Sequence, residues 1–253
     1  MPEVLAFFQQ GPAVEAIGIG SFGPIDLHRE SAGYGRITST PKLEWRNYDI
    51  VAAVQTAFGA PVGFDTDVDA AALAEGRWGA GKDVRDFVYL TIGTGIGGGA
   101  IVNGAAAHGL AHSEMGHTPV PHDRTRDPFP GCCPYHGDCL EGLASGPALQ
   151  ARWGTPADLL PADHPAWELE AHYLALGLSS LVYAFSPRRL LLGGGVMRQA
   201  HLFDLIRREL ARLVNGYVCV GEVLPPQLGQ QAGVLGGLVL AEQALARGAD
   251  TPR

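Results

Sequence analysis

The sequence predicts an α/β protein. Apolar segments typical of strands alternate with alanine-rich or amphipathic segments typical of helices along the 253 residues, and this alternation favours a sheet covered by helices. Glycine accounts for 35 of the 253 residues, about 14%, against a usual share of about 7%. This excess indicates many tight turns and close-packed elements. The length suits one large domain or two domains of roughly 100–150 residues each.

The first four predicted elements alternate strand, helix, strand and helix. Residues 15–20 are apolar and run into a glycine-containing turn, which predicts a buried strand, and residues 50–57 have a helical pattern. Residues 61–64 predict a short strand. The alanine-rich stretch 67–78 predicts a helix, because it begins with acidic residues, which are favourable at a helix N-terminus.

A hairpin and a long irregular segment are predicted next. Residues 87–92 are β-branched and aromatic, so they predict a strand, and residues 98–102 predict its hairpin partner. Residues 104–142 differ, because they are dense in Pro, His, Cys and Asp and show no period. A long irregular stretch within a compact domain usually has a function or is held in place by other groups.

The C-terminal part predicts a helix, a strand and two further helices. An apolar helical face extends over residues 174–185 and ends before Pro187, which cannot continue a helix. Residues 189–192 predict a strand, and residues 202–214 carry an apolar helical stripe. Residues 233–247 are alanine-rich and predict the last helix.

Charge and cysteine content exclude several classes of protein. The 18 basic and 26 acidic side chains give a net charge of −8 without a basic cluster, which argues against nucleic acid or an anionic membrane as partner. With 46% hydrophobic and 17% charged residues, intrinsic disorder is not expected. The four cysteines and the absence of a basic, apolar leader at the N-terminus predict a reduced, cytoplasmic protein.

Residues 108–141 are dense in metal-ligating side chains, because they contain five of the nine histidines and three of the four cysteines. Cys133, His136 and Cys139 are spaced three residues apart, so one ion can contact all three. Either His112 or His117 could complete the tetrahedral N/S set that zinc prefers. A closed set of four ligands leaves no position for water, so the predicted metal is structural. The alternative is a group of unrelated polar loop residues.

Two glycine runs and several acids are the other candidates for a site. Residues 91–97 follow a strand, and their backbone N–H groups and threonine hydroxyls can bind phosphate, or they form a plain hairpin turn. Residues 193–195 can allow a purine to lie against the backbone, or form only a turn.

Asp65, Asp67 and Asp69 lie where a strand gives way to a helix. One carboxylate there can accept a proton from a substrate hydroxyl, and helix capping is the alternative. Glu114 and Glu141 flank the cysteine and histidine cluster and can hold sugar hydroxyls by bidentate hydrogen bonds.

Several motifs follow one another along the chain: I-G-I-G-S-F-G-P-I-D, I-T-S-T-P-K-L-E-W-R-N, D-T-D-V-D-A-A-A-L-A-E, T-I-G-T-G-I-G-G-G, H-S-E-M-G-H, C-P-Y-H-G-D-C-L-E-G-L-A-S-G-P-A and L-L-L-G-G-G-V-M. In this order they resemble the ROK family of sugar kinases and repressors, and most of all its bacterial fructokinase branch. The resemblance extends from about Glu3 to Ala244. It implies an actin/hexokinase-like ATPase fold with two lobes around a cleft.

The resemblance implies ATP-dependent phosphorylation of D-fructose, or another hexose, at O6 by a homodimer, with Mg²⁺ accompanying ATP. Asp67 matches the catalytic base of the family, with Thr66 in place of the usual Asn. Glu114, His117 and Glu141 match the sugar-binding residues. A ROK repressor is not expected, because no helix-turn-helix precedes the kinase-like part.

The same resemblance assigns the zinc and nucleotide contacts. The implied zinc ligands are His117, Cys133, His136 and Cys139. The implied phosphate contacts are Thr91, Gly93, Thr94, Gly95 and Gly97, and the adenosine motif falls on Gly193, Gly194 and Gly195.

One family motif is missing, the N-terminal phosphate loop of the type D/E-x-G-G-T-K, because Met1 falls inside the first helix of the family pattern. We therefore expect residues 1–77, completed by the C-terminal helix 233–253, to form a truncated small lobe, and residues 78–232 to form a large lobe. Loss of one clamp on ATP makes a catalytically impaired, sugar-binding pseudokinase or sensor the alternative function.

Overall fold

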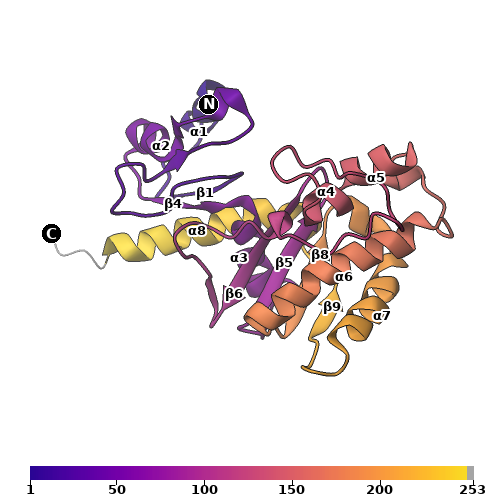
Figure 1. Ribbon diagram of the computed structural model, residues 1–253. Helices are drawn as coiled ribbons and strands as arrows, with labels where there is room; N and C mark the ends of the chain where they lie inside the picture. Colours follow the sequence, from indigo (N-terminus) through magenta and orange to yellow (C-terminus); the bar gives the residue numbers. More distant parts are fainter. Residues whose placement is uncertain (250–253) are drawn as a thin grey trace. The chain divides into compact units, whose positions relative to one another are not determined.

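The computed structural model describes residues 1–249, and the chain divides into two compact units (Figure 1). Unit 1 comprises Met1–Ala74, His108–His112 and the C-terminal segment from Gln230. Unit 2 comprises Glu75–Ala107 and Ser113–Gly229. The chain therefore passes between the units several times.

The predicted C-terminal segment, residues 233–253, includes residues 250–253, which lie outside the described residues. The assignment of residues 1–77 with this segment to a small lobe, and of 78–232 to a large lobe, stays a prediction. The boundary between the units lies inside the helix α3 (Asp67–Trp78), which has the predicted bounds.

Unit 1 is built on two parallel strands, β1 (Ile17–Ser21) and β4 (Val62–Thr66), which pack against the helix α8 (Ala232–Ala249). Their contact depends on glycine: a Cβ atom on Gly18 would lie 1.7 Å from the carbonyl oxygen of Gly237. These elements confirm the predicted strands and last helix within one or two residues. They also show that part of the glycine excess serves close packing of a helix on strands.

The rest of unit 1 consists of α1 (Pro2–Gln9), α2 (Ile50–Phe58) and a small antiparallel pair, β2 (Arg36–Ile37) with β3 (Tyr48–Asp49). The carboxylate of Asp49 accepts the N–H of Ala52 at 2.9 Å, which caps α2 where the sequence predicts its start. The strands β2 and β3 were not predicted, because two residues are too short to show a period.

Unit 2 contains a five-stranded sheet in the order β7-β6-β5-β8-β9. The strands are β5 (Phe87–Ile92), β6 (Ile96–Val102), β7 (Ala105–Ala106), β8 (Arg189–Gly193) and β9 (Glu222–Leu224). β5 and β6 are antiparallel, which confirms the predicted hairpin, whereas β8 is parallel to both β5 and β9.

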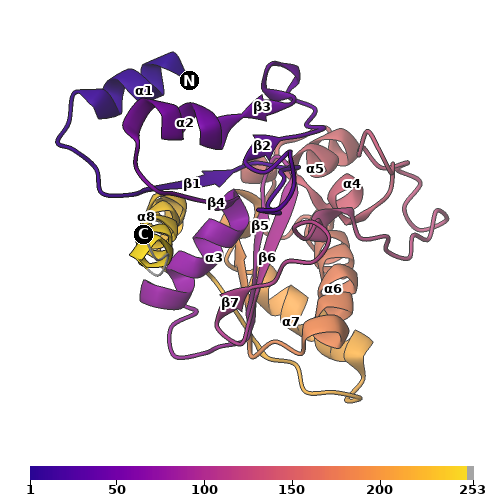
Figure 2. The same ribbon diagram turned by 90° about the vertical axis from the view of Figure 1, so that its left-hand side faces the viewer.

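Helices cover this sheet, with α6 (Ala166–Phe185) and α7 (Leu202–Val214) side by side (Figures 1 and 2). α7 has the predicted bounds. α6 begins eight residues before the predicted helix 174–185, because its first turns carry polar residues that interrupt the apolar pattern. Two short helices, α4 (Leu140–Ala144) and α5 (Gly146–Trp153), were not predicted. Among residues 1–249, no helix is both long and apolar enough to cross a membrane.

Candidate functional site

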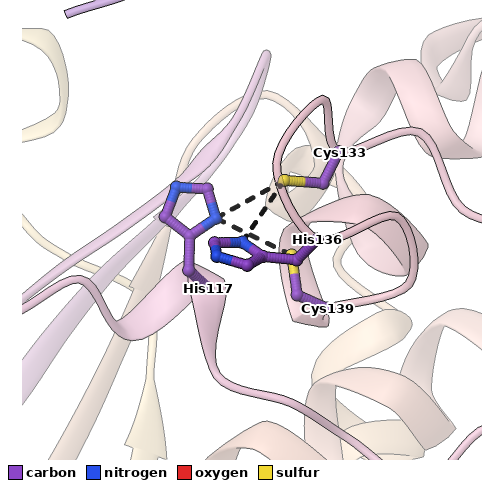
Figure 3. Close-up of side chains that lie close together, drawn as sticks. All are labelled: His117, Cys133, His136 and Cys139. Atoms are coloured by element: carbon purple, nitrogen blue, oxygen red, sulfur yellow. Dashed lines mark hydrogen bonds between the residues drawn. The ribbon is translucent and has the colours of Figure 1, made fainter. Parts of the chain in front are cut away.

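Four metal-ligating side chains converge in unit 2 (Figure 3): His117, Cys133, His136 and Cys139, each with a ligand atom within 4.8 Å of the others. Cys133 Sγ lies 3.6 Å from His117 Nδ1 and 3.7 Å from His136 Nδ1, and Cys139 Sγ lies 3.7 Å from His117 Nδ1. In a tetrahedral site with Zn–S of about 2.3 Å and Zn–N of about 2.1 Å, sulfur and nitrogen are about 3.6 Å apart. The four side chains therefore fit a zinc ion.

The local backbone brings these ligands together. Cys133 and Gly137 exchange two backbone hydrogen bonds, of 3.1 and 2.9 Å, which close a turn around His136. The φ angle of Gly137 is +66°, in the region that favours glycine. Leu140 N donates to Thr118 O at 3.0 Å, which holds the segment after His117 beside Cys139.

Of the two candidates for the fourth ligand, His117 lies in this group. His112 belongs to unit 1, where its Nε2 accepts the N–H of Ile25 at 3.1 Å. Cys132 is exposed and is not a member of the cluster.

Without a bound cation, the surroundings of Cys139 favour its neutral thiol. Burial raises the pKa of Cys139 to about 11, and the neighbouring Cys133 and Glu141 act in the same direction. Both thiols are buried. A zinc ion replaces the protons of thiols and supplies the positive charge that their ionised forms need.

The turn between β5 and β6 is the glycine run predicted to bind phosphate. Gly93 N donates to Gly95 O at 2.9 Å, and Gly146 N, at the start of α5, donates to Gly93 O at 2.8 Å. Glu141 of α4 accepts the N–H of Ile96 at 2.8 Å. A Cβ on Gly95 would lie 2.6 Å from the same Glu141 oxygen, so this carboxylate packs directly on the turn.

The second glycine run, 193–195, follows β8, which pairs in parallel with β5. Gly194 has a φ of +93°, and a Cβ there would lie 2.2 Å from the carbonyl oxygen of Ile92. Both glycine runs therefore lie at the carboxyl ends of two adjacent parallel strands. Ligands of α/β proteins typically bind at this edge of a sheet.

The three acids at the junction of β4 and α3 lie in different surroundings within unit 1. Asp65 and Asp69 are buried and face His108, whereas Asp67, the first residue of α3, reaches the surface. Partial desolvation raises the pKa of Asp67, although the N–H of Val68 and the charge of Lys42 oppose the rise. A carboxylate with a raised pKa is a better proton acceptor near neutral pH.

The sequence profile of the ROK family matches residues 3–244. The chain belongs to the ROK family. This ROK protein is 46% identical over 240 residues to the fructokinase of Zymomonas mobilis, covering 92% of this chain and 79% of that protein. It has the actin/hexokinase-like ATPase fold that the sequence predicts.

Two solved ROK structures share this fold. The ROK hexokinase from Thermus thermophilus superposes with a TM-score of 0.77 and 31% identity, covering 92% of this chain and 80% of that one. The ROK glucokinase from Streptomyces griseus, solved with glucose and AMPPNP, superposes with a TM-score of 0.73 and 28% identity over 96% of this chain and 87% of that one.

Most of the predicted site residues of this ROK protein belong to unit 2. Glu114 precedes the turn Met115–His117, and its carbonyl oxygen accepts the N–H of His117 at 3.0 Å. Glu141 lies in the first turn of α4, two residues after Cys139. Asp67 belongs to unit 1. The functional roles of these residues stay predictions.

One residue of this region was missed in the sequence. His108 contacts Asp65 and Asp69 in unit 1, although the sequence indicated the acids only. The available signal was the density of histidine before Glu114, which we interpreted entirely as a metal site. A pairing across 43 positions between Asp65 and His108 has no local pattern that a single sequence can show.

Proposed function

We propose that this ROK protein is an ATP-dependent hexose kinase that phosphorylates D-fructose at O6. The observation that carries the proposal is the 46% identity to a fructokinase over 92% of the chain, compared with 28% to the glucokinase solved with glucose and AMPPNP. Glucose, mannose and other hexoses are the competing substrates.

In this reaction Asp67 acts as the general base. As the sugar O6 attacks the γ-phosphorus of ATP, Asp67 takes the hydroxyl proton, the bond between the γ-phosphorus and the bridging oxygen breaks, and ADP leaves. The exposed position of Asp67 and its raised pKa support this role. The carboxylates of Asp65 and Asp69 are committed to other partners.

We propose that the sugar is held by Glu114, His117 and Glu141. His117 directs Nδ1 toward the cysteines, which leaves Nε2 for a sugar hydroxyl. One carboxylate oxygen of Glu141 accepts the N–H of Ile96 in the β5–β6 turn, and the other would accept a hydrogen bond from a sugar hydroxyl. Glu141 thereby links the sugar to the phosphate-binding turn.

The nucleotide is assigned to the two glycine runs at the sheet edge. Backbone N–H groups and threonine hydroxyls of residues 91–97 would bind phosphate oxygens, and residues 193–195 would lie against adenosine. Mg²⁺ bound to ATP supplies neutralisation of the phosphate charge.

Zinc, held by His117, Cys133, His136 and Cys139, would have a structural role. The four ligands come from two segments separated by an irregular loop, so the ion crosslinks that loop. It supplies no reactive water, because the four protein ligands complete the tetrahedral set. Location in the cytoplasm and a homodimer stay predictions.

A coupled assay of ADP release, with fructose, glucose and mannose as substrates, tests the proposal. We expect kcat/KM to be highest for fructose and ³¹P NMR to identify fructose 6-phosphate. A higher kcat/KM for glucose would overturn the substrate. Sugar binding without ADP release from any hexose would overturn the kinase function and favour the sugar-binding pseudokinase.

A further inference from the structure

A group of titratable side chains surrounds the turn from β4 to α3 in unit 1. His108 Nε2 lies 3.0 Å from Asp65 Oδ1 and 3.5 Å from Asp69 Oδ2. The two carboxylates are 8% and 1% exposed, whereas the His108 side chain is 32% exposed. One imidazole is therefore shared between two buried acids.

The two carboxylates favour a protonated ring at His108. Hydrogen bonds to Asp65 and Asp69 raise the pKa of His108 to about 10, although burial opposes the rise. A positive charge then lies between two carboxylates that would otherwise repel each other in a buried site. Desolvation and the charge of Asp65 raise the pKa of Asp69, while its hydrogen bond to His108 opposes them.

Thr66 also stabilises this turn, through hydrogen bonds to Asp65 and Asp69. Its hydroxyl donates to Asp69 Oδ2 at 2.8 Å and accepts the N–H of Asp69 at 3.0 Å. The N–H of Thr66 donates to Asp65 Oδ1 at 2.8 Å. Thr66 is thus hydrogen-bonded to both Asp65 and Asp69, and these two acids also contact His108. Asp67 lies between them in the chain, in the turn that these contacts hold.

We propose that His108 is a positioning residue for phosphoryl transfer, because its simultaneous pairing with Asp65 and Asp69 fixes the turn that presents Asp67. The inference rests on the proposed kinase function with Asp67 as base. His108 touches no reacting atom in this role. Misplacement of a catalytic group by about 1 Å can cost about 10²-fold in rate, so the effect of losing His108 falls on kcat.

Other contacts keep the His108 segment attached to unit 1 when this pairing is removed. His112 Nε2 accepts the N–H of Ile25, and the ring of His28 is hydrogen-bonded to the carbonyl oxygen of Leu110. Two contacts besides the His108 pairing thus hold the segment His108–His112. A substitution at His108 therefore removes the link to the turn without freeing the whole segment.

The substitution His108→Gln tests the inference, because it keeps a hydrogen-bond donor and removes the charge. We expect kcat to fall about 10- to 100-fold while the KM values for fructose and ATP stay near wild type. Adding Asp69→Asn should restore part of kcat, since it removes one unpaired negative charge. His28→Gln is the matched control, because it alters the same segment without touching the turn, and it should keep wild-type kcat.

Two kinetic results would overturn the inference while the kinase function stands. One is an unchanged kcat in His108→Gln, and the other is a loss that Asp69→Asn does not relieve. Nitrogen-15 NMR of the wild-type imidazoles gives a readout that does not depend on activity or on folding of a variant. We expect His108 to titrate far above the ordinary value of about 6.5.

Titration of His108 near its ordinary value, or ring-nitrogen signals of a metal-bound imidazole, would also contradict the shared ion pair. Absence of kinase activity toward every hexose in the wild-type protein would instead overturn the proposed function, and the role of His108 with it. The two failures are therefore distinguishable.

Discussion

Asp65, Asp67 and Asp69 are neighbours in sequence but differ in burial and partners. Asp65 and Asp69 are buried and both contact His108, whereas Asp67 reaches the surface. Strand and helix geometry produce this division, because the chain changes direction at Asp67. A general base needs an accessible carboxylate with a suitable pKa, and of these three acids Asp67 is the exposed one.

Asp67→Asn should lower kcat by about 10²- to 10⁴-fold, the usual contribution of a general base. KM for fructose should change little, because the amide keeps the shape of the side chain. In the wild type, the raised pKa of Asp67 should place the acid limb of the kcat profile above the range of an ordinary aspartate, since the base must be ionised. Steady-state kinetics against pH measures both effects, and near-normal turnover of the variant would contradict the assignment.

Glu170 is a second acid whose surroundings decide its charge. It is fully buried in α6, and neither carboxylate oxygen has a hydrogen-bond partner among the described residues. Burial raises its pKa well above the ordinary value, although the charge of Arg152 opposes the rise. The folded protein therefore binds a proton at Glu170 at pH values where the unfolded chain releases it.

Glu170→Gln should stabilise the protein at pH 8 more than at pH 5. Because the folded pKa of Glu170 is raised, the wild type loses stability as the pH rises from the unfolded pKa toward the folded one. The loss is about 1.4 kcal/mol for each unit that separates the two values, and a neutral amide avoids it. Thermal unfolding at both pH values measures the difference. An equal effect at pH 5 and pH 8 would show that Glu170 does not carry this proton.

At the scale of elements, the irregular loop between η2 (Met115–His117) and α4 is held at several points. Arg152 of α5 donates to Asp127 and to the carbonyl oxygen of Leu143, and Tyr173 of α6 donates to Asp127 at 2.7 Å. The two hydrogen bonds to Asp127 anchor the middle of the loop to α5 and α6. The cysteine and histidine cluster brings the two ends of the loop together. The loop is therefore stabilised by hydrogen bonds in its middle and by the cluster at its ends.

Cys139→Ala should reduce zinc from about one ion per chain to almost none and lower the melting temperature, because a structural ion contributes to folding. Cys132→Ala is the matched control, since Cys132 is exposed and lies outside the cluster. Metal analysis and thermal unfolding measure both variants. Retention of stoichiometric zinc in Cys139→Ala would show that the ion is bound elsewhere.

At the scale of the whole molecule, each unit has its own means of packing. In unit 2, a large apolar core lies between the sheet and its helices and includes Leu90, Leu143 and Leu178. Unit 1 has a smaller core, and its strands approach α8 through glycines. Close backbone contact between β1 and α8 therefore adds to the side-chain core of unit 1.

Gly18→Ala should destabilise unit 1, because the new Cβ would lie 1.7 Å from the carbonyl oxygen of Gly237. Relief of such overpacking typically costs about 1–3 kcal/mol. Gly233→Ala, also in unit 1, is the control, since a Cβ there meets no atom within 4 Å. Denaturant unfolding of the two variants measures the difference. Equal stability of both would contradict the close contact between β1 and α8.

Long regular elements could be predicted from the sequence. The helix bounds Asp67–Trp78 and Leu202–Val214 and the β5–β6 hairpin follow from local period and composition. The short helices α4 and α5 could not be predicted in this way, because their cohesion comes from Ser145 and from packing on α6. One or two turns show too little period to distinguish a helix from a loop.

By itself, the sequence determined which chemistry is available: the spacing of Cys133, His136 and Cys139, the glycine runs and the acids before α3. Spacing alone left His112 and His117 as alternatives and the family resemblance implied His117, which the tertiary structure places in the cluster while His112 contacts Ile25. The tertiary structure also decided that His108 pairs with Asp65 and Asp69. The reason is physical: spacing along a chain constrains only neighbours, whereas contacts between distant residues depend on how strands and helices pack in three dimensions.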